Sequence, residues 1–143
     1  MKALVIYDSN LGNTKLIAET IAGELGADAR AVSVTNVKAD DLAGVELLVV
    51  GSPIIGWKPT ERMQQFLAGL RHGQLRGIKA SSFDTRVKIL IHGDAAKEMA
   101  QKLKELGAEI VAEPAPFYVK GKEGPLFDGE VEKAKAWAKK LIK

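Results

Sequence analysis

Residues 4–22 read LVIYDSNLGNTKLIAETIA and combine a strand, a polar loop and the start of a helix. The run 4–7 is β-branched and aromatic, which favours a strand buried on both faces. Apolar residues then recur at helical spacing over 16–25, which predicts a helix. The intervening loop, 8–14, is rich in hydroxyl and amide side chains. Such a loop directs backbone N–H groups and the positive end of a helix dipole at one point, so the stretch predicts an anion site, usually for phosphate.

A solvated turn with an ordinary helix cap is the alternative interpretation, because Ser, Asn and Thr are favoured there for local reasons. The loop lacks the GK[ST] ending of a Walker A motif and does not match GxGxxG. Hydroxyl and amide groups are nevertheless dense on both sides of Gly12, which favours phosphate over the plain turn.

The spacing of these residues resembles the signature of the flavodoxin family. The residues that match it are Ile6, Tyr7, Ser9, Gly12, Thr14, Ala18 and Ile21. In that family the loop binds the terminal phosphate of FMN, largely with neutral donors. The resemblance therefore implies FMN as the cofactor. It implies that the phosphate is held by Ser9, Asn10, Leu11, Gly12, Asn13 and Thr14.

A second loop follows the apolar run 46–50, which predicts another buried strand. This second loop carries large apolar residues at its tip, where they need another group to cover them. Packing onto the core or against another subunit is one explanation, and a planar, mostly apolar ligand is the better one. The resemblance implies that one side of the isoalloxazine ring contacts Ser52, Pro53, Ile54, Ile55, Gly56 and Trp57. It also implies that Gly56 permits a peptide flip that offers a carbonyl group to flavin N5.

Two further candidate strands, 79–83 and 87–91, lie too close together for a parallel crossover. One of them must therefore be a loop or an antiparallel appendage. The resemblance favours 81–83 as the central strand and 84–93 as a third loop beside the flavin. It implies that the other side of the ring contacts Phe83, Asp84, Thr85 and Arg86.

The alternation of strands and helices predicts an α/β fold, with helices on both faces of a parallel sheet. Shorter runs predict strands at 30–34 and 109–111, the second extended by 115–119 after a proline interruption. The resemblance implies a flavodoxin-like, doubly wound, five-stranded sheet in the order 2-1-3-4-5, formed by a single domain over residues 1–143. Ligands of such sheets bind outside the carboxyl ends of the strands, and flavodoxin with FMN is itself the standard example of this rule.

Composition excludes several other classes of site. The chain has 143 residues and no cysteine, which excludes disulfides and cysteine-ligated clusters, and its two histidines make an all-histidine metal site improbable. No apolar run reaches the roughly 18 residues of a membrane span, so we expect a cytoplasmic protein with no membrane partner. The net charge is +3, and lysines recur along the last predicted helix without interleaved aromatic residues. We therefore expect no nucleic-acid partner, and a monomer or weak dimer.

No acid–base or nucleophilic constellation stands out in the sequence, which fits a protein whose flavin supplies the chemistry. The leading hypothesis is an FMN-binding electron carrier that shuttles electrons between redox partner proteins. An FMN-dependent NAD(P)H or quinone oxidoreductase is the enzymatic alternative, and a binding module without flavin is the third. A receiver domain is rejected because Asp8 lacks the acidic neighbour such domains need. Flavodoxins are usually acidic, so this basic chain predicts a basic docking surface.

Overall fold

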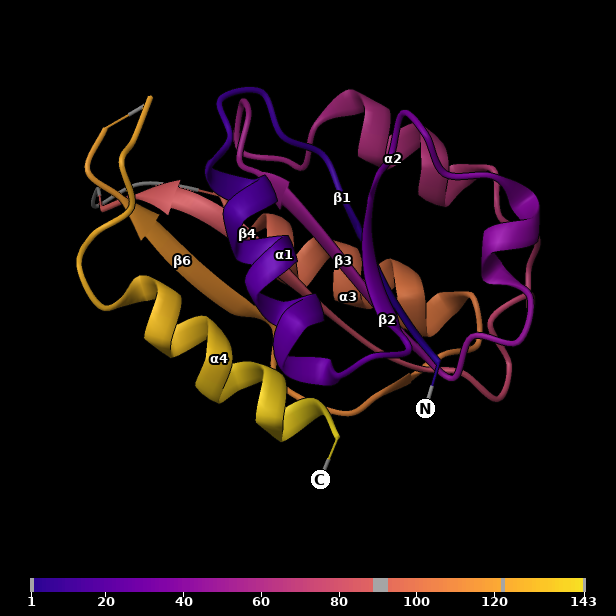
Figure 1. Cartoon of the computed structure of the whole chain (residues 1–143). Helices are drawn as coiled ribbons and strands as arrows, with labels where there is room; N and C mark the ends of the chain where they lie inside the picture. Colours follow the sequence, from indigo (N-terminus) through magenta and orange to yellow (C-terminus); the bar gives the residue numbers. More distant parts are fainter. Residues whose placement is uncertain (1, 89–92, 122, 143) are drawn as a thin grey trace.

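The computed structural model describes residues 2–88, 93–121 and 123–142, and in them one sheet lies between two layers of helices (Figure 1). The strands are β1 (Ala3–Tyr7), β2 (Ala29–Ser33), β3 (Leu47–Pro53), β4 (Lys79–Val87), β5 (Glu109–Ile110) and β6 (Ala115–Val119). The helices are α1 (Asn13–Leu25), α2 (Glu61–Ala68), α3 (Ala95–Glu105), α4 (Glu130–Leu141) and the 3-10 helix η1 (Ala39–Leu42). Within these described ranges, no helix is long and apolar enough to cross a membrane.

The strands pair in parallel in the order β2-β1-β3-β4-β5, which confirms the predicted doubly wound topology. The outer position beside β4 is shared, because β5 pairs with its first residues and β6 with its last. All carboxyl ends therefore open on one edge of the sheet, the upper edge in Figure 1.

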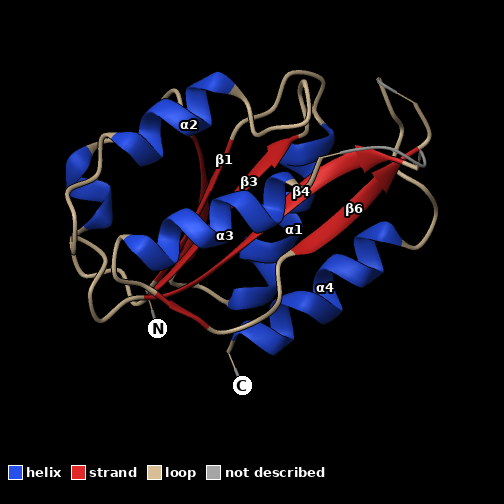
Figure 2. Cartoon of the chain, turned by 180° about the vertical axis from the view of Figure 1, so that it is seen from behind, coloured by secondary structure: helices blue, strands red, loops and turns tan. Residues whose placement is uncertain are grey.

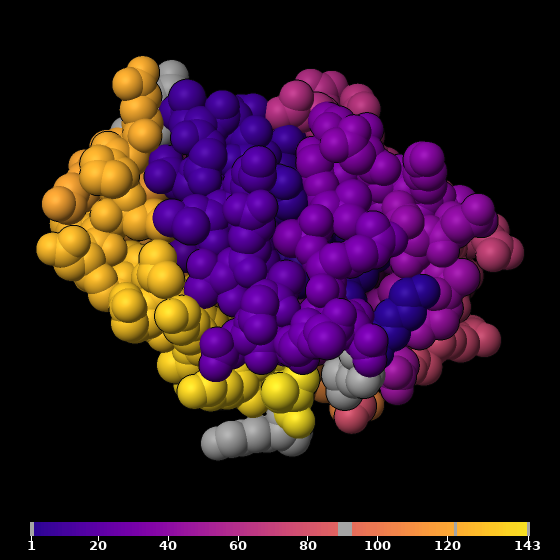
Figure 3. All heavy atoms as spheres, in the orientation of Figure 1, coloured from indigo at the N-terminus to yellow at the C-terminus, as the bar shows by residue number. Residues whose placement is uncertain are grey.

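Both faces of the sheet are covered, so successive side chains of one strand enter different cores. In β1, Val5 packs in the cluster under α1 and α4, whereas Leu4 and Ile6 pack in the cluster under α2 and α3. Figure 2 shows the sheet with α3 and α2 in front of it, and Figure 3 shows α1 and α4 side by side over part of the opposite face. The prediction that β1 is buried on both faces is confirmed by its unbroken burial.

The length of β4 corrects the predicted third loop. Residues 84–87 continue the strand and do not begin a loop, because β3 supplies partners on one side and β6 on the other. Thr85 pairs with Pro53 across the first interface and with Phe117 across the second. The run 79–83 and Val87 thus belong to one strand, and residues 89–91 of the other predicted run lie outside the described residues.

The outer side of β6 is bonded to α4 and to the segment before it. The Tyr118 backbone N–H donates to Glu130 Oε1 at 2.6 Å, and its carbonyl accepts the Phe127 N–H at 3.0 Å. Lys133 Nζ donates to the Pro116 carbonyl at 2.7 Å. Since proline has no N–H, every outward-facing backbone polar group of these two strand residues has a partner.

The carboxylate of Asp41 should make the stability of the fold depend on pH. The backbone N–H of Lys38 and the guanidinium of Arg30 hold the pKa of Asp41 below its usual value. Its contribution to the free energy of unfolding is therefore present above the ordinary carboxyl pKa and lost as the pH falls through the lowered one. Urea unfolding should find Asp41→Asn less stable than wild type at neutral pH and equal to it in strong acid. A difference that grows in acid would contradict this assignment.

Candidate functional site

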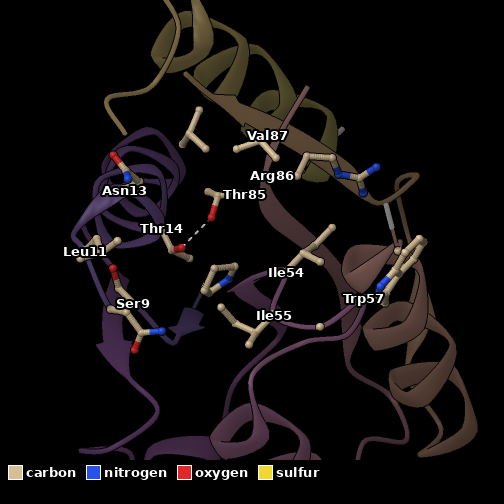
Figure 4. A pocket seen from close by; sticks show the side chains of 15 residues that line it. Ser9, Leu11, Asn13, Thr14, Ile54, Ile55, Trp57, Thr85, Arg86 and Val87 are labelled. Carbon is tan, nitrogen blue, oxygen red and sulfur yellow. Dashed lines mark hydrogen bonds between the residues drawn. The ribbon is translucent and has the colours of Figure 1, made fainter. Parts of the chain in front are cut away.

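A cavity of about 620 Å³ opens at the carboxyl ends of β1, β3 and β4 (Figure 4). Its size falls within the range of roughly 300–1,000 Å³ found for small-molecule sites. The residues that line it are Ser9, Asn10, Leu11, Asn13, Thr14, Pro53, Ile54, Ile55, Gly56, Trp57, Thr85, Arg86, Val87, Gly93 and Val119.

One end of the cavity is polar and is formed by the start of α1. Gly12 precedes the helix with φ +93° and has no side chain to cap it, and Ser9 Oγ instead accepts the first-turn N–H of Lys15 at 3.3 Å. Ser9 Oγ accepts the Gly12 N–H at 3.1 Å, which folds the loop back over the helix start. The buried hydroxyls of Thr14 and Thr85 are 2.9 Å apart and join the helix to β4. Asn13 and Thr14 bring first-turn N–H groups, which no intrahelical carbonyl can satisfy, to the cavity wall.

The other end of the cavity is apolar. Ile54 and Trp57 lie across from Ser9 and Thr14 in Figure 4, with Val87 between the two ends. Trp57 exposes 56% and Ile55 50% of its surface. The second loop therefore presents large apolar side chains at the cavity, and the planar ligand expected there remains a prediction.

A tight turn presents these apolar residues. The backbones of Ile55 and Lys58 exchange hydrogen bonds of 2.8 and 3.2 Å around Gly56 and Trp57. Gly56 has φ +57° and Trp57 φ +77°, the combination of a type I′ turn. A left-handed conformation costs a non-glycine residue roughly 1–2 kcal/mol, so the surrounding structure must hold Trp57 there. Gly93 packs against this turn, since a Cβ at Gly93 would lie 1.8 Å from the Trp57 carbonyl oxygen.

An ion pair between the buried Asp8 and the half-exposed Arg62 ties the loop at the polar end of the cavity to α2. Asp8 is 1% exposed and accepts the Thr60 hydroxyl at 2.6 Å and Arg62 Nε at 2.9 Å. One terminal nitrogen of Arg62 also lies 2.9 Å from Asp8 Oδ1 and donates to Asn10 Oδ1 at 2.7 Å. The Thr60 N–H in turn donates to Ser52 Oγ at 2.9 Å, which extends the network to the second loop.

A second ion pair lies at the end of β4. Arg86 donates to both oxygens of Asp84, at 2.8 and 2.6 Å, and to Asp94 at 3.1 Å. Asp84 also accepts the Ala96 N–H at 2.8 Å. Burial raises the pKa of the Asp84 carboxyl even though Arg86 opposes the shift. The polar side chains at the end of β4 therefore have hydrogen-bond partners within the protein.

The structure brings most of the predicted site residues together. Twelve of them line the cavity, and four do not: Gly12, Ser52, Phe83 and Asp84. Gly12 shapes the loop and Ser52 holds Thr60, whereas Phe83 is fully buried in the core under α1 and α4. Phe83 and Asp84 were expected beside a flavin ring, but neither residue lines the cavity.

Three lining residues were not among the named site residues: Val87 and Gly93, which lie within the predicted third loop, and Val119. The network around Arg62 was missed altogether. Val87 and Val119 are partners across the β4–β6 interface, so the pairing of these strands was the signal needed to find them. Among the residues that the structure describes, no group of three potential metal-ligating side chains is gathered.

Comparison with known proteins identifies a family whose sequences resemble this chain. A model of the flavodoxin domain matches residues 4–105. The chain is also 32% identical over 157 residues to an uncharacterised protein of Methanocaldococcus jannaschii, and the match covers 100% of this chain and 99% of that one.

Solved structures agree with the fold. An archaeal flavodoxin superimposes with a TM-score of 0.77 and 25% identity over the full length of both chains. Oxidised flavodoxin 1 from Bacillus cereus superimposes with a TM-score of 0.83 over 99% of this chain and 97% of that chain. At 22% identity, the second match bears on the fold alone.

Proposed function

This chain belongs to the flavodoxin family, and on that premise we propose that it binds FMN in the cavity and works as an electron carrier. Membership of the family implies a flavin, and the observation that carries the choice of FMN is the division of the cavity. A polar end formed by the start of α1 faces an apolar end formed by a tight turn. A flavin mononucleotide has the same division, with a phosphate at one end and a ring system at the other.

The polar end suits a phosphate held without a cation from the loop itself. Ser9, Asn13 and Thr14 supply hydroxyl and amide groups, and the start of α1 adds backbone N–H groups and its dipole. Lys15 is the first basic residue of the helix, and its side chain does not line the cavity. Neutral donors would therefore do most of the binding.

The apolar end suits the isoalloxazine ring. Trp57 would cover one face of it, and Ile54, Val87 and Val119 would surround the remainder. Gly56 would supply a peptide that can change orientation with little steric cost, since nothing lies within 4 Å of the position of its missing Cβ. Bound FMN would supply the redox chemistry, and these residues would orient it and limit its contact with water.

The test is reconstitution of the apoprotein with FMN. We expect a yellow protein with a flavin absorption spectrum and quenched flavin fluorescence, which is reduced by dithionite and reoxidised by a one-electron acceptor. An assay with NAD(P)H and quinone distinguishes the carrier from an oxidoreductase, because a carrier alone should show no sustained turnover. A colourless protein that takes up no flavin would refute the proposal.

We further propose that the partners of this carrier present acidic surfaces. Leu11, Ile55 and Trp57 form an exposed apolar rim around the cavity. Exposed basic residues adjoin the lining residues in the chain, at Lys15, Lys58, Lys88 and Lys120. An apolar centre with a basic border would attract and orient an acidic protein so that electrons pass at the cavity mouth.

Small charged oxidants can measure the field at this mouth. In the double variant Lys15→Glu/Lys58→Glu, oxidation of the reduced protein by ferricyanide should slow several-fold at low salt, and oxidation by hexaamminecobalt(III) should speed up. The matched control is Lys135→Glu/Lys140→Glu on α4, which changes the net charge equally away from the cavity lining. Equal effects of the two double variants would show that only net charge matters.

A further inference from the structure

The carboxylate of Asp8 is placed where it should hinder an anion. It directly precedes Ser9, the first residue of the loop that lines the polar end of the cavity. Asp8 is 1% exposed, so water screens its charge poorly. A phosphate monoester carries a charge of about −1.5 to −2 at neutral pH, and it would be repelled by a bare carboxylate at this position.

Arg62 removes that obstacle from outside the cavity. Its Nε and one terminal nitrogen reach the two oxygens of Asp8, each at 2.9 Å. The Thr60 hydroxyl, at 2.6 Å, adds a third donor to the same carboxylate. The pair carries no net charge, so the phosphate side of the cavity is left with neutral groups and the helix start.

Arg62 also decides which way the Asn10 amide faces. A guanidinium group has only donors, so the atom it contacts at 2.7 Å must be the carbonyl oxygen of the amide. The NH₂ group of Asn10 is thereby turned away from Arg62. Asn10 lines the cavity, so this NH₂ group is left as a donor for a ligand there.

From these contacts we propose that Arg62 is a positioning residue that makes this site selective for the phosphorylated flavin. It neutralises Asp8 and orients Asn10 without touching the ligand. This inference rests on the proposed function, because it concerns the phosphate of the same cofactor. Its distinguishing consequence is that Arg62 affects the binding of FMN and leaves the binding of riboflavin, which has the same ring and no phosphate, unchanged.

The test is titration of apoprotein variants with FMN and with riboflavin, followed by flavin fluorescence. Arg62→Met should raise the Kd for FMN about tenfold or more, the scale of one lost charge-assisted hydrogen bond. The Kd for riboflavin should stay within about twofold. In Asp8→Asn/Arg62→Met the repelling carboxylate is gone, so part of the FMN affinity should return, and the two changes should not be additive.

Arg30→Met is the matched control, since Arg30 pairs with Asp41 and is as exposed as Arg62, at 53% against 51%. It should change neither affinity. Arg62→Lys keeps the charge and loses the forked geometry of the guanidinium group, so its loss of affinity should be smaller and limited to FMN. If urea unfolding shows that Arg62→Met does not fold, Arg62→Lys takes its place in the test.

An unchanged FMN affinity, or an equal loss for FMN and riboflavin, would overturn the inference while leaving the proposed function intact. A wild-type protein that binds neither flavin would refute the proposed function and this inference together.

Discussion

Phe83→Ala should lower the free energy of unfolding by roughly 3–5 kcal/mol, the usual cost of removing a buried aromatic side chain. Phe83 is fully buried and packs edge-on against Phe117 and Trp137, with ring centroids 5.9 and 6.3 Å away. Its ring also covers Gly51 on the neighbouring strand, where a Cβ would lie 2.0 Å from the ring. The void left by alanine cannot close easily, because its walls are strands and two other rings.

Urea unfolding measures this loss, which should appear as a lower midpoint with an unchanged m-value. Gly51→Ala should itself be destabilising, because the new methyl group meets the Phe83 ring. Combined with Phe83→Ala, it should cost much less, since the ring is no longer there. Phe66→Ala is the control for a phenylalanine that is only partly buried. A loss of under about 1 kcal/mol for Phe83→Ala would show that the core collapses around the gap.

Gly93→Ala should weaken the binding of the flavin ring about tenfold or more, the loss expected when the ring-binding turn is displaced. The added Cβ would lie 1.8 Å from the Trp57 carbonyl oxygen and 2.7 Å from its Cα. Both are backbone atoms, so the turn must move. Because Trp57 already has φ +77°, there is little freedom for it to adjust in place.

Titration with FMN and riboflavin checks this prediction, and both affinities should fall together because the ring is the part affected. Gly121→Ala is the matched control, since nothing lies within 4 Å of its Cβ position and its φ is not positive. If Gly93→Ala binds both flavins as tightly as wild type, the Ile55–Lys58 turn does not hold the ring. The pattern differs from that expected of Arg62→Met, which separates the two ends of the cavity.

The sequence was sufficient for the elements whose signal is local. The buried run 4–7, the polar loop after it and the helical spacing of apolar residues over 16–25 predicted β1 and the helix that follows the loop. The second loop was predicted equally well, because Ile55 and Trp57 are large apolar residues in a loop whose glycine permits a tight turn.

Where prediction failed, the deciding partners were distant in the chain. Asp84, Thr85 and Arg86 are polar and were interpreted as a loop, yet each is satisfied inside a strand. Thr85 bonds to Thr14, which is 71 residues away, and Asp84 accepts an N–H from the start of α3. Polar composition indicates a loop only when no remote partner is known.

The same limit applies to Arg62. In the sequence it is one basic residue 54 positions from Asp8, and nothing nearby marks it as part of the site. Its role depends on the topology, which places the start of α2 beside the end of β1.

The hydrogen bonds between β6 and α4 also affect whether copies of this protein can associate through the edge of the sheet. An outermost strand ordinarily offers a ladder of unmet donors and acceptors, onto which another chain can add and begin an aggregate. Here Glu130, Lys133 and Phe127 occupy the outward positions of Pro116 and Tyr118, so that ladder is closed from within. The last helix and the segment before it thus protect this edge of the sheet, beside the cavity, against association with another strand, through hydrogen bonds that an added strand would have to displace.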